Sequence, residues 1–100
     1  MNQQTLKTSY RFEGRGLHTG KYAHMTVMPA PADHGIRFVR TDMEVEIPAI
    51  ASKVTRTDRS TTITEGDVSV ITIEHLMSAL TGLGVDNARI EIDNEEVPIL

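Results

Sequence analysis

Cysteine is absent from this chain of 100 residues. Neither a disulfide framework nor a metal site built on thiolates is therefore possible, and a metal ion would have to be held by histidine and carboxylate side chains. The absence of cysteine also fits a reducing compartment.

An excess of positive charge is missing as well. The chain has 10 Lys and Arg against 14 Asp and Glu, which gives a formal net charge of -4 at pH 7. The basic residues are scattered among acidic ones, so there is no broad positive field for a phosphate backbone or an acidic membrane surface. We therefore expect no nucleic acid among the partners.

Long apolar runs are lacking too. No stretch is long enough to span a bilayer, so we expect no transmembrane segment. The first residues, Met1 to Gln4, lack the basic flank and apolar stretch of a signal peptide. A cytoplasmic location is the expectation.

The size of the chain predicts one domain. With 39% hydrophobic residues among 100, it is large enough for one compact core and too small for two. Residues Val97 to Leu100 end on two large apolar side chains, whereas natural termini tend to be polar. We therefore expect residues 1–100 to be an incomplete domain that continues in the natural protein.

Apolar and polar side chains alternate in the first half of the chain, as they do in half-buried strands. A glycine-rich loop is predicted at residues 14–16, and Asp33, His34 and Gly35 are typical of a hairpin turn between two antiparallel strands. The strands are predicted over residues 5–12, 22–29, 35–40 and 45–50.

Further strands are predicted in the second half. Residues 52–64 are rich in Thr and Ser, and a turn at 65–67 leads to a short strand at 68–70. We expect these residues to continue the same sheet. Residues 88–92 alternate as a last strand.

One segment has a clear helical period. Thr72 is placed as its N-cap, and Gly82 lies just past its last turn. The prediction is an α+β fold class: a two-layer domain in which a mostly antiparallel sheet packs against one amphipathic helix, with a second helix expected beyond residue 100. The apolar arc of the predicted helix consists of Ile73, Leu76, Met77, Leu80 and Leu83.

Glu74 and His75 lie outside this arc, on opposite flanks of the helix. Both are in the first turn, where the helix dipole favours a carboxylate and keeps His75 in the neutral form that binds metals. Two interpretations stay open: the pair carries out chemistry at a metal, or Glu74 only complements the dipole and His75 is solvated. The pair alone does not decide, because a zinc site needs about three protein ligands.

The segment Gly14 to Gly20 also allows two interpretations. It has Thr19 where a dinucleotide fingerprint needs glycine, and it precedes a strand, so a nucleotide cofactor is not expected there. Its glycines either allow positive φ with His18 exposed at the tip, or the loop places Leu17 and His18 beside a substrate.

The remaining polar residues are assigned no chemistry. His24 and His34 are expected at the surface. Residues 93–96 lack the ligand spacing of a calcium loop and are expected to form a turn. Ion pairs with nearby carboxylates are expected for Arg37, Arg40, Arg56 and Arg59.

Three segments occur together in this order: Gly16-Leu-His-Thr-Gly20, then Thr72-Ile-Glu-His-Leu-Met-Ser-Ala-Leu80 with Gly82-Leu-Gly-Val-Asp-Asn87, then Glu96-Val-Pro-Ile-Leu100. Together they resemble the UDP-3-O-acyl-N-acetylglucosamine deacetylase family. The resemblance covers nearly the whole chain, and its middle block is much more specific than the Glu-His pair alone.

The resemblance implies a zinc-dependent hydrolase that removes the N-acetyl group from UDP-3-O-acyl-N-acetylglucosamine, a step of lipid A biosynthesis. It implies that His75 is a zinc ligand and that Glu74 is the general base for the attacking water. The residues implied to line the substrate side are Leu17, His18, Arg59, Ser60 and Thr61.

The same resemblance implies that residues 1–100 are the amino-terminal domain of a two-domain enzyme. The other zinc ligands, a His and an Asp, and a general-acid His would come from the second domain, so the chain alone is expected to be inactive. The implied partners are a UDP-linked acylated amino sugar and that second domain. A non-catalytic ligand-binding domain and a purely structural sheet domain remain alternatives.

Overall fold

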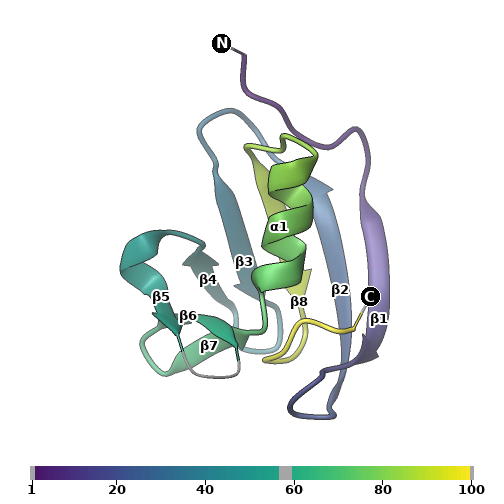
Figure 1. Cartoon of the computed structure of the whole chain (residues 1–100), viewed down its shortest axis with the longest axis vertical. Helices are drawn as coiled ribbons and strands as arrows, with labels where there is room; N and C mark the ends of the chain where they lie inside the picture. The colour runs from purple at the N-terminus through teal and green to yellow at the C-terminus, as the bar shows by residue number, and fades with distance from the viewer. Residues whose placement is uncertain (1, 57–59, 100) are drawn as a thin grey trace.

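The computed structural model describes residues 2–56 and 60–99, apart from the side chain of Arg56. Within them the fold has two sheets and one α-helix, which confirms the α+β class (Figure 1). The five-stranded sheet runs in the order β1 (Tyr10–Arg15), β2 (Tyr22–Pro29), β8 (Ala88–Ile92), β3 (Ile36–Arg40) and β4 (Val45–Pro48).

The remaining elements lie on one side of this sheet. A 3₁₀ turn, η1 (Ala51–Lys53), leads into a second sheet of β5 (Val54–Arg56), β6 (Thr61–Glu65) and β7 (Val68–Ile71). The helix α1 (Glu74–Gly82) crosses in front of the larger sheet (Figure 1).

The predicted continuation of the same sheet after residue 52 is wrong, because β5, β6 and β7 form a sheet of their own. The buried side chains of Ile63, Val68 and Val70 belong to the same core as those of the larger sheet. The small sheet therefore covers a part of the core that one short helix cannot reach.

The predicted hairpin at residues 33–35 is also wrong. β8 lies between β2 and β3, antiparallel to β2 and parallel to β3. Its inward side chains, Ala88, Ile90 and Ile92, are fully buried, as expected for a strand at the centre of the sheet. Asn87 fixes this arrangement, because its Oδ1 accepts the Gly35 N–H at 2.7 Å.

The first strand begins later than predicted, and the glycines do not interrupt it. Residues 22–29 form β2 as predicted, whereas β1 runs from Tyr10 through Gly14 to Arg15. The reason lies in the C-terminal segment: the Ile99 N–H donates to the Arg15 carbonyl at 3.1 Å, and Gly16 pairs with Pro98. Residues without a Cβ let this segment approach the end of the strand.

The helix is present, but both predicted caps are wrong. Its N-cap is Ile73, without a side-chain cap, and Thr72 has a φ of 62°. The Thr72 hydroxyl donates instead to the buried carboxylate of Glu96. Gly82 lies inside the helix, and the left-handed residue after it is Gly84, with a φ of 73°.

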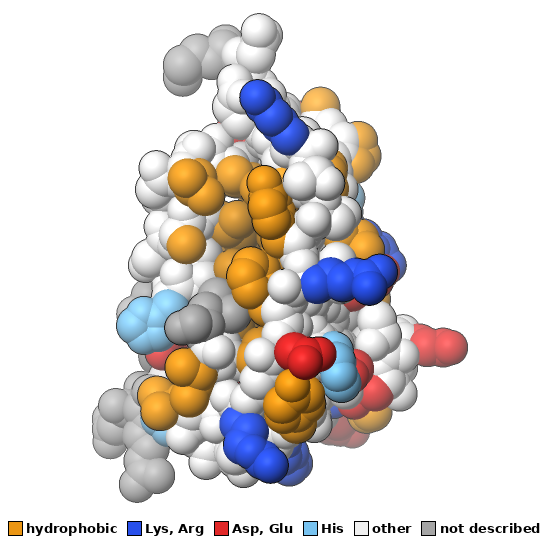
Figure 2. All heavy atoms as spheres, turned by 90° about the vertical axis from the view of Figure 1, so that its right-hand side faces the viewer, with side chains coloured by type: hydrophobic (Ala, Val, Ile, Leu, Met, Phe, Trp, Pro, Cys, Tyr) orange, Lys and Arg blue, Asp and Glu red, His pale blue; other side chains and the backbone are white. Residues whose placement is uncertain are grey.

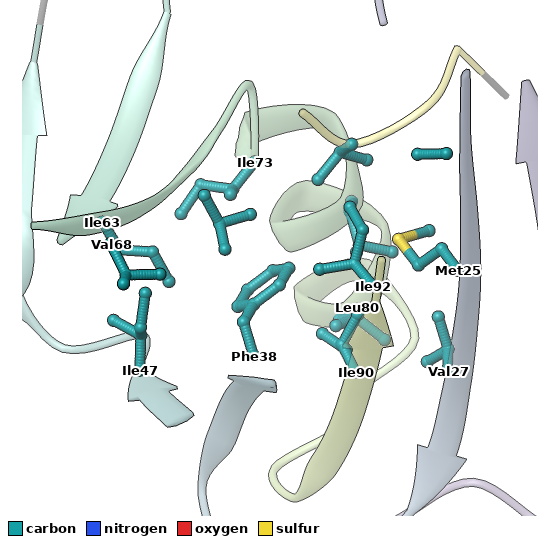
Figure 3. Packing of buried hydrophobic residues seen from close by; sticks show 14 residues of the cluster. Met25, Val27, Phe38, Ile47, Ile63, Val68, Ile73, Leu80, Ile90 and Ile92 are labelled. Atoms are coloured by element: carbon teal, nitrogen blue, oxygen red, sulfur yellow. The ribbon is translucent and has the colours of Figure 1, made fainter. Parts of the chain in front are cut away.

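One core joins both sheets and the helix. Phe38 of β3 lies at its centre, between side chains of the small sheet on one side and those of α1 and β8 on the other (Figure 3). The start of the helix and its inner face contribute Ile73, Leu76 and Leu80, while Leu83, predicted in the arc, is 74% exposed because it follows the last helical turn.

The outer face of the larger sheet is polar. Two of the predicted arginine pairs are confirmed: Arg37 Nη1 lies 3.2 Å from Glu46 on this face, and Arg40 Nη2 lies 2.7 Å from Asp42. Arg40 itself is buried on the inner side, where it also donates to the Ser69 carbonyl. The side chains of the other two predicted arginines lie outside the described residues. The predicted catalytic residues lie on the opposite side, which carries α1.

Candidate functional site

The first turn of α1 carries the predicted general base, Glu74, and the predicted zinc ligand, His75, whose side chains line different hollows. His75 is exposed, and Glu74 is half-buried. The Thr61 N–H donates to Glu74 Oε2 at 3.1 Å, so β6 holds this carboxylate.

His75 faces a hollow of about 380 Å³. Its walls come from the loop residue Leu17, from the start of α1 and from Val97–Ile99. Leu17, predicted on the substrate side, and His75, predicted as a zinc ligand, thus line the same hollow although they are far apart in sequence. Figure 2 shows the β1 edge of the molecule, where hydrophobic side chains form a band between charged ones.

Glu74 lines a second hollow of about 280 Å³. Thr61 lies there with it, together with apolar side chains that include Ile73 and Met77. Ser60, next along the chain, is half-buried. The predicted substrate residues are thus divided, with Thr61 beside Glu74 and Leu17 beside His75, and Arg59 lies outside the described residues.

The side chain of His18 is exposed, and its main chain takes part in a feature that the sequence did not predict. The Glu96 carboxylate is 1% exposed and accepts the N–H of His18 at 3.0 Å and that of Thr19 at 2.7 Å. It also accepts the Thr72 hydroxyl at 2.5 Å. A residue assigned to a surface turn is therefore a buried hydrogen-bonding centre.

The electrostatics of Glu96 follow from these contacts. Burial raises the pKa of its carboxyl, but the hydrogen bonds from Thr72, Thr19 and His18 outweigh burial and hold the pKa below its ordinary value. The neighbouring Glu95 differs, because it pairs with Lys21 Nζ at 2.8 Å on the surface. Charge and spacing do not distinguish these two adjacent glutamates, and the available signal is that Glu96 alone begins one of the three segments that resemble the family.

Thr72 is held in a strained backbone conformation. A β-branched residue with a φ of 62° is rare, and such a residue costs about 1–3 kcal/mol, which the surrounding contacts must offset. The hydrogen bond to Glu96 and the burial of Thr72 supply such contacts. The strain lies directly before the helix that carries Glu74 and His75.

The described residues do not complete a metal site by themselves. No group of three or more His, Asp or Glu side chains in residues 2–56 and 60–99 could hold a metal ion. His75, exposed at the rim of its hollow, is accessible to serve as one ligand. No helix in the described part of the chain is long and apolar enough to cross a membrane.

A sequence model of the UDP-3-O-acyl N-acetylglycosamine deacetylase family matches residues 3–100. The chain belongs to this family. The resemblance carried by the three segments is thereby confirmed, and the two hollows lie at the most specific of them, the block that begins at Thr72.

Individual members of the family are similar over the whole chain. UDP-3-O-acyl-N-acetylglucosamine deacetylases from Cellvibrio japonicus, Teredinibacter turnerae and Pseudomonas entomophila are 55%, 52% and 51% identical to it over 102 aligned positions. Each alignment covers all of this chain and 34% of the relative. The chain therefore spans about a third of the length of the curated relatives it matches.

Proposed function

We propose that residues 1–100 are the amino-terminal domain of a zinc-dependent deacetylase that removes the N-acetyl group from UDP-3-O-acyl-N-acetylglucosamine in lipid A biosynthesis. Family membership over the whole chain supports this reaction. The observation that carries the proposal is an exposed His75 at the rim of a hollow, in the first turn of α1, with Glu74 beside it.

His75 would be one protein ligand of the zinc ion. Imidazole is a common metal ligand, and the side chain of His75 is exposed and accessible. Because the described residues form no group of three ligands, the others would come from the second domain. When bound, the zinc ion would polarise the acetamide carbonyl and lower the pKa of the attacking water.

Glu74 would be the general base. The Thr61 N–H, which donates to its Oε2, holds the carboxylate in place, and a carboxylate can take a proton from water. Adjacent helix positions are about 100° apart, so a substrate lying across the start of α1 can contact both Glu74 and His75. Hydrolysis would release acetate and leave a free amine on the sugar.

The residues assigned to the substrate side are Leu17, His18, Arg59, Ser60 and Thr61. Leu17 and Thr61 line the two hollows, which supports their assignment. The protein would act in the cytoplasm, with a UDP-linked acylated amino sugar and its own second domain as partners.

The direct test is acetate release from UDP-3-O-acyl-N-acetylglucosamine by the full-length protein. We expect turnover that a chelator abolishes and added zinc restores. Binding of the sugar nucleotide without turnover would instead support a non-catalytic ligand-binding domain. If the protein neither binds nor hydrolyses the sugar nucleotide, the result would favour the structural sheet domain.

A further inference from the structure

We propose that Glu96 is a positioning residue that fixes the substrate loop, residues 16–20, against the start of α1. This inference rests on the proposed function, because it assigns Glu96 a role in presenting that loop to the substrate. Glu96 is not a catalytic residue: its carboxylate is 1% exposed and does not line either hollow at α1.

The contacts of the carboxylate join two segments that are far apart in sequence. From the loop it accepts the main-chain N–H groups of His18 and Thr19, at 3.0 and 2.7 Å. From the helix start it accepts the Thr72 hydroxyl. Leu17 and Thr72 both line the hollow that His75 faces, so one carboxylate sets the distance between two of its walls.

The loop packs directly on the carboxylate, with no space between them. A Cβ built on Gly16 would lie 2.1 Å from Glu96 Oε1, far inside any real contact. The glycine therefore permits a close approach of backbone to carboxylate, and the hydrogen bonds hold it there. The close packing at Gly16 and the hydrogen bonds to the Glu96 carboxylate therefore favour the same position of the loop.

The main chain of Glu96 is anchored independently of its side chain. The Ile71 N–H donates to the Glu95 carbonyl at 2.7 Å, and the Val97 N–H donates to the Ile71 carbonyl at 3.2 Å. Main-chain hydrogen bonds to Ile71, the last residue of β7, thus hold segment 95–97 without the Glu96 side chain. Changing the carboxylate should release the loop while the segment stays in place.

The test uses the full-length enzyme with Glu96→Gln, which keeps the shape but turns an NH₂ donor toward the loop amides. The expected result is a KM for the UDP-linked substrate raised about tenfold or more, because the substrate loop is misplaced. The zinc content should be unchanged, and kcat should change less than about threefold. Glu95→Gln is the matched control, because it removes only a surface pair. A KM for Glu96→Gln equal to that of the control overturns the proposal.

Amide hydrogen exchange provides a second readout that needs no turnover. The His18 and Thr19 amides should exchange about 10- to 100-fold faster in Glu96→Gln than in the unmodified protein, as expected for the loss of hydrogen bonds to a charged acceptor. If Glu96→Gln does not fold, the exchange rates of these two amides in the unmodified protein provide the test. Exchange as fast as that of free loop amides overturns the proposal, whereas slow exchange supports it. An inactive unmodified enzyme would refute the proposed function, while the exchange comparison would still test the role of Glu96.

Discussion

Gly16→Ala should destabilise the fold through the Glu96 carboxylate. The new methyl would lie 2.1 Å from Oε1, whereas real Cβ contacts under 3.0 Å are essentially absent. The carboxylate must therefore retreat by roughly 1 Å, a shift that overpacking typically requires. Its 2.7 Å hydrogen bond from Thr19 would then pass beyond hydrogen-bonding distance.

The size of the effect depends on how many hydrogen bonds to the carboxylate are broken. Hydrogen bonds to a charged group contribute about 1.5–3 kcal/mol each, and overpacking costs about 1–3 kcal/mol. Because the carboxylate can keep some donors as it moves, we expect a loss of about 2–4 kcal/mol in the free energy of unfolding. Gly82→Ala is the control: nothing lies within 4 Å of its added Cβ, and alanine in a helix should add about 0.5–1 kcal/mol.

Urea unfolding of the chain followed by circular dichroism measures both changes. For a small domain with a slope of about 1–2 kcal/mol per M, the midpoint should fall by roughly 1–4 M for Gly16→Ala and rise slightly for Gly82→Ala. A Gly16→Ala midpoint within about 0.3 M of the unmodified chain would refute the close packing of loop and carboxylate.

Three other predictions follow from the core, the charge and the metal. Leu80→Ala, at a buried position of α1, should lower the free energy of unfolding by about 2–5 kcal/mol, whereas Ser78→Ala, on the exposed face, should lower it by less than about 0.5 kcal/mol. Equal urea midpoints for the two variants would mean that the helix is not packed on the sheet. Because the folded pKa of Glu96 is depressed, its charge stabilises the fold fully above the ordinary value of 4.5, and this contribution disappears as pH falls through the folded pKa. The urea midpoint should therefore fall less between pH 6 and pH 3 in Glu96→Gln than in the unmodified chain. Calorimetric titration of the 100-residue chain should detect no sub-micromolar zinc binding, and stoichiometric binding that vanishes in His75→Ala would contradict a site shared with a second domain.

Much of the fold could be predicted from local patterns. The alternation in residues 22–29 and the helical spacing around Leu80 each identified an element, because these periods are set by the strand and helix geometry itself. The place of residues 88–92 could not be predicted in this way. Their position between β2 and β3 depends on burial in the completed sheet, while local turn chemistry favoured a hairpin at Gly35.

In the candidate site, too, local patterns predicted some features and long-range contacts determined the others. The helical wheel places His75 outside the apolar arc, the resemblance implies that it is a metal ligand, and in the structure it lines a hollow. Thr72 looked like an N-cap because threonine before an apolar helix usually is one. Its actual partner, Glu96, is 24 residues further on, and long-range hydrogen bonds of this kind leave no local signal in a single sequence.

The central claim is that this chain carries one zinc ligand and the general base of a deacetylase. It is tested most directly by measuring zinc content and kcat of the full-length protein with His75→Ala and with Glu74→Ala. His75→Ala should lose zinc, whereas Glu74→Ala should keep it and lose about 10²- to 10⁴-fold in kcat, the usual contribution of a general base. Equal loss of zinc in both variants, or a fall in kcat of less than about tenfold for Glu74→Ala, would contradict these roles.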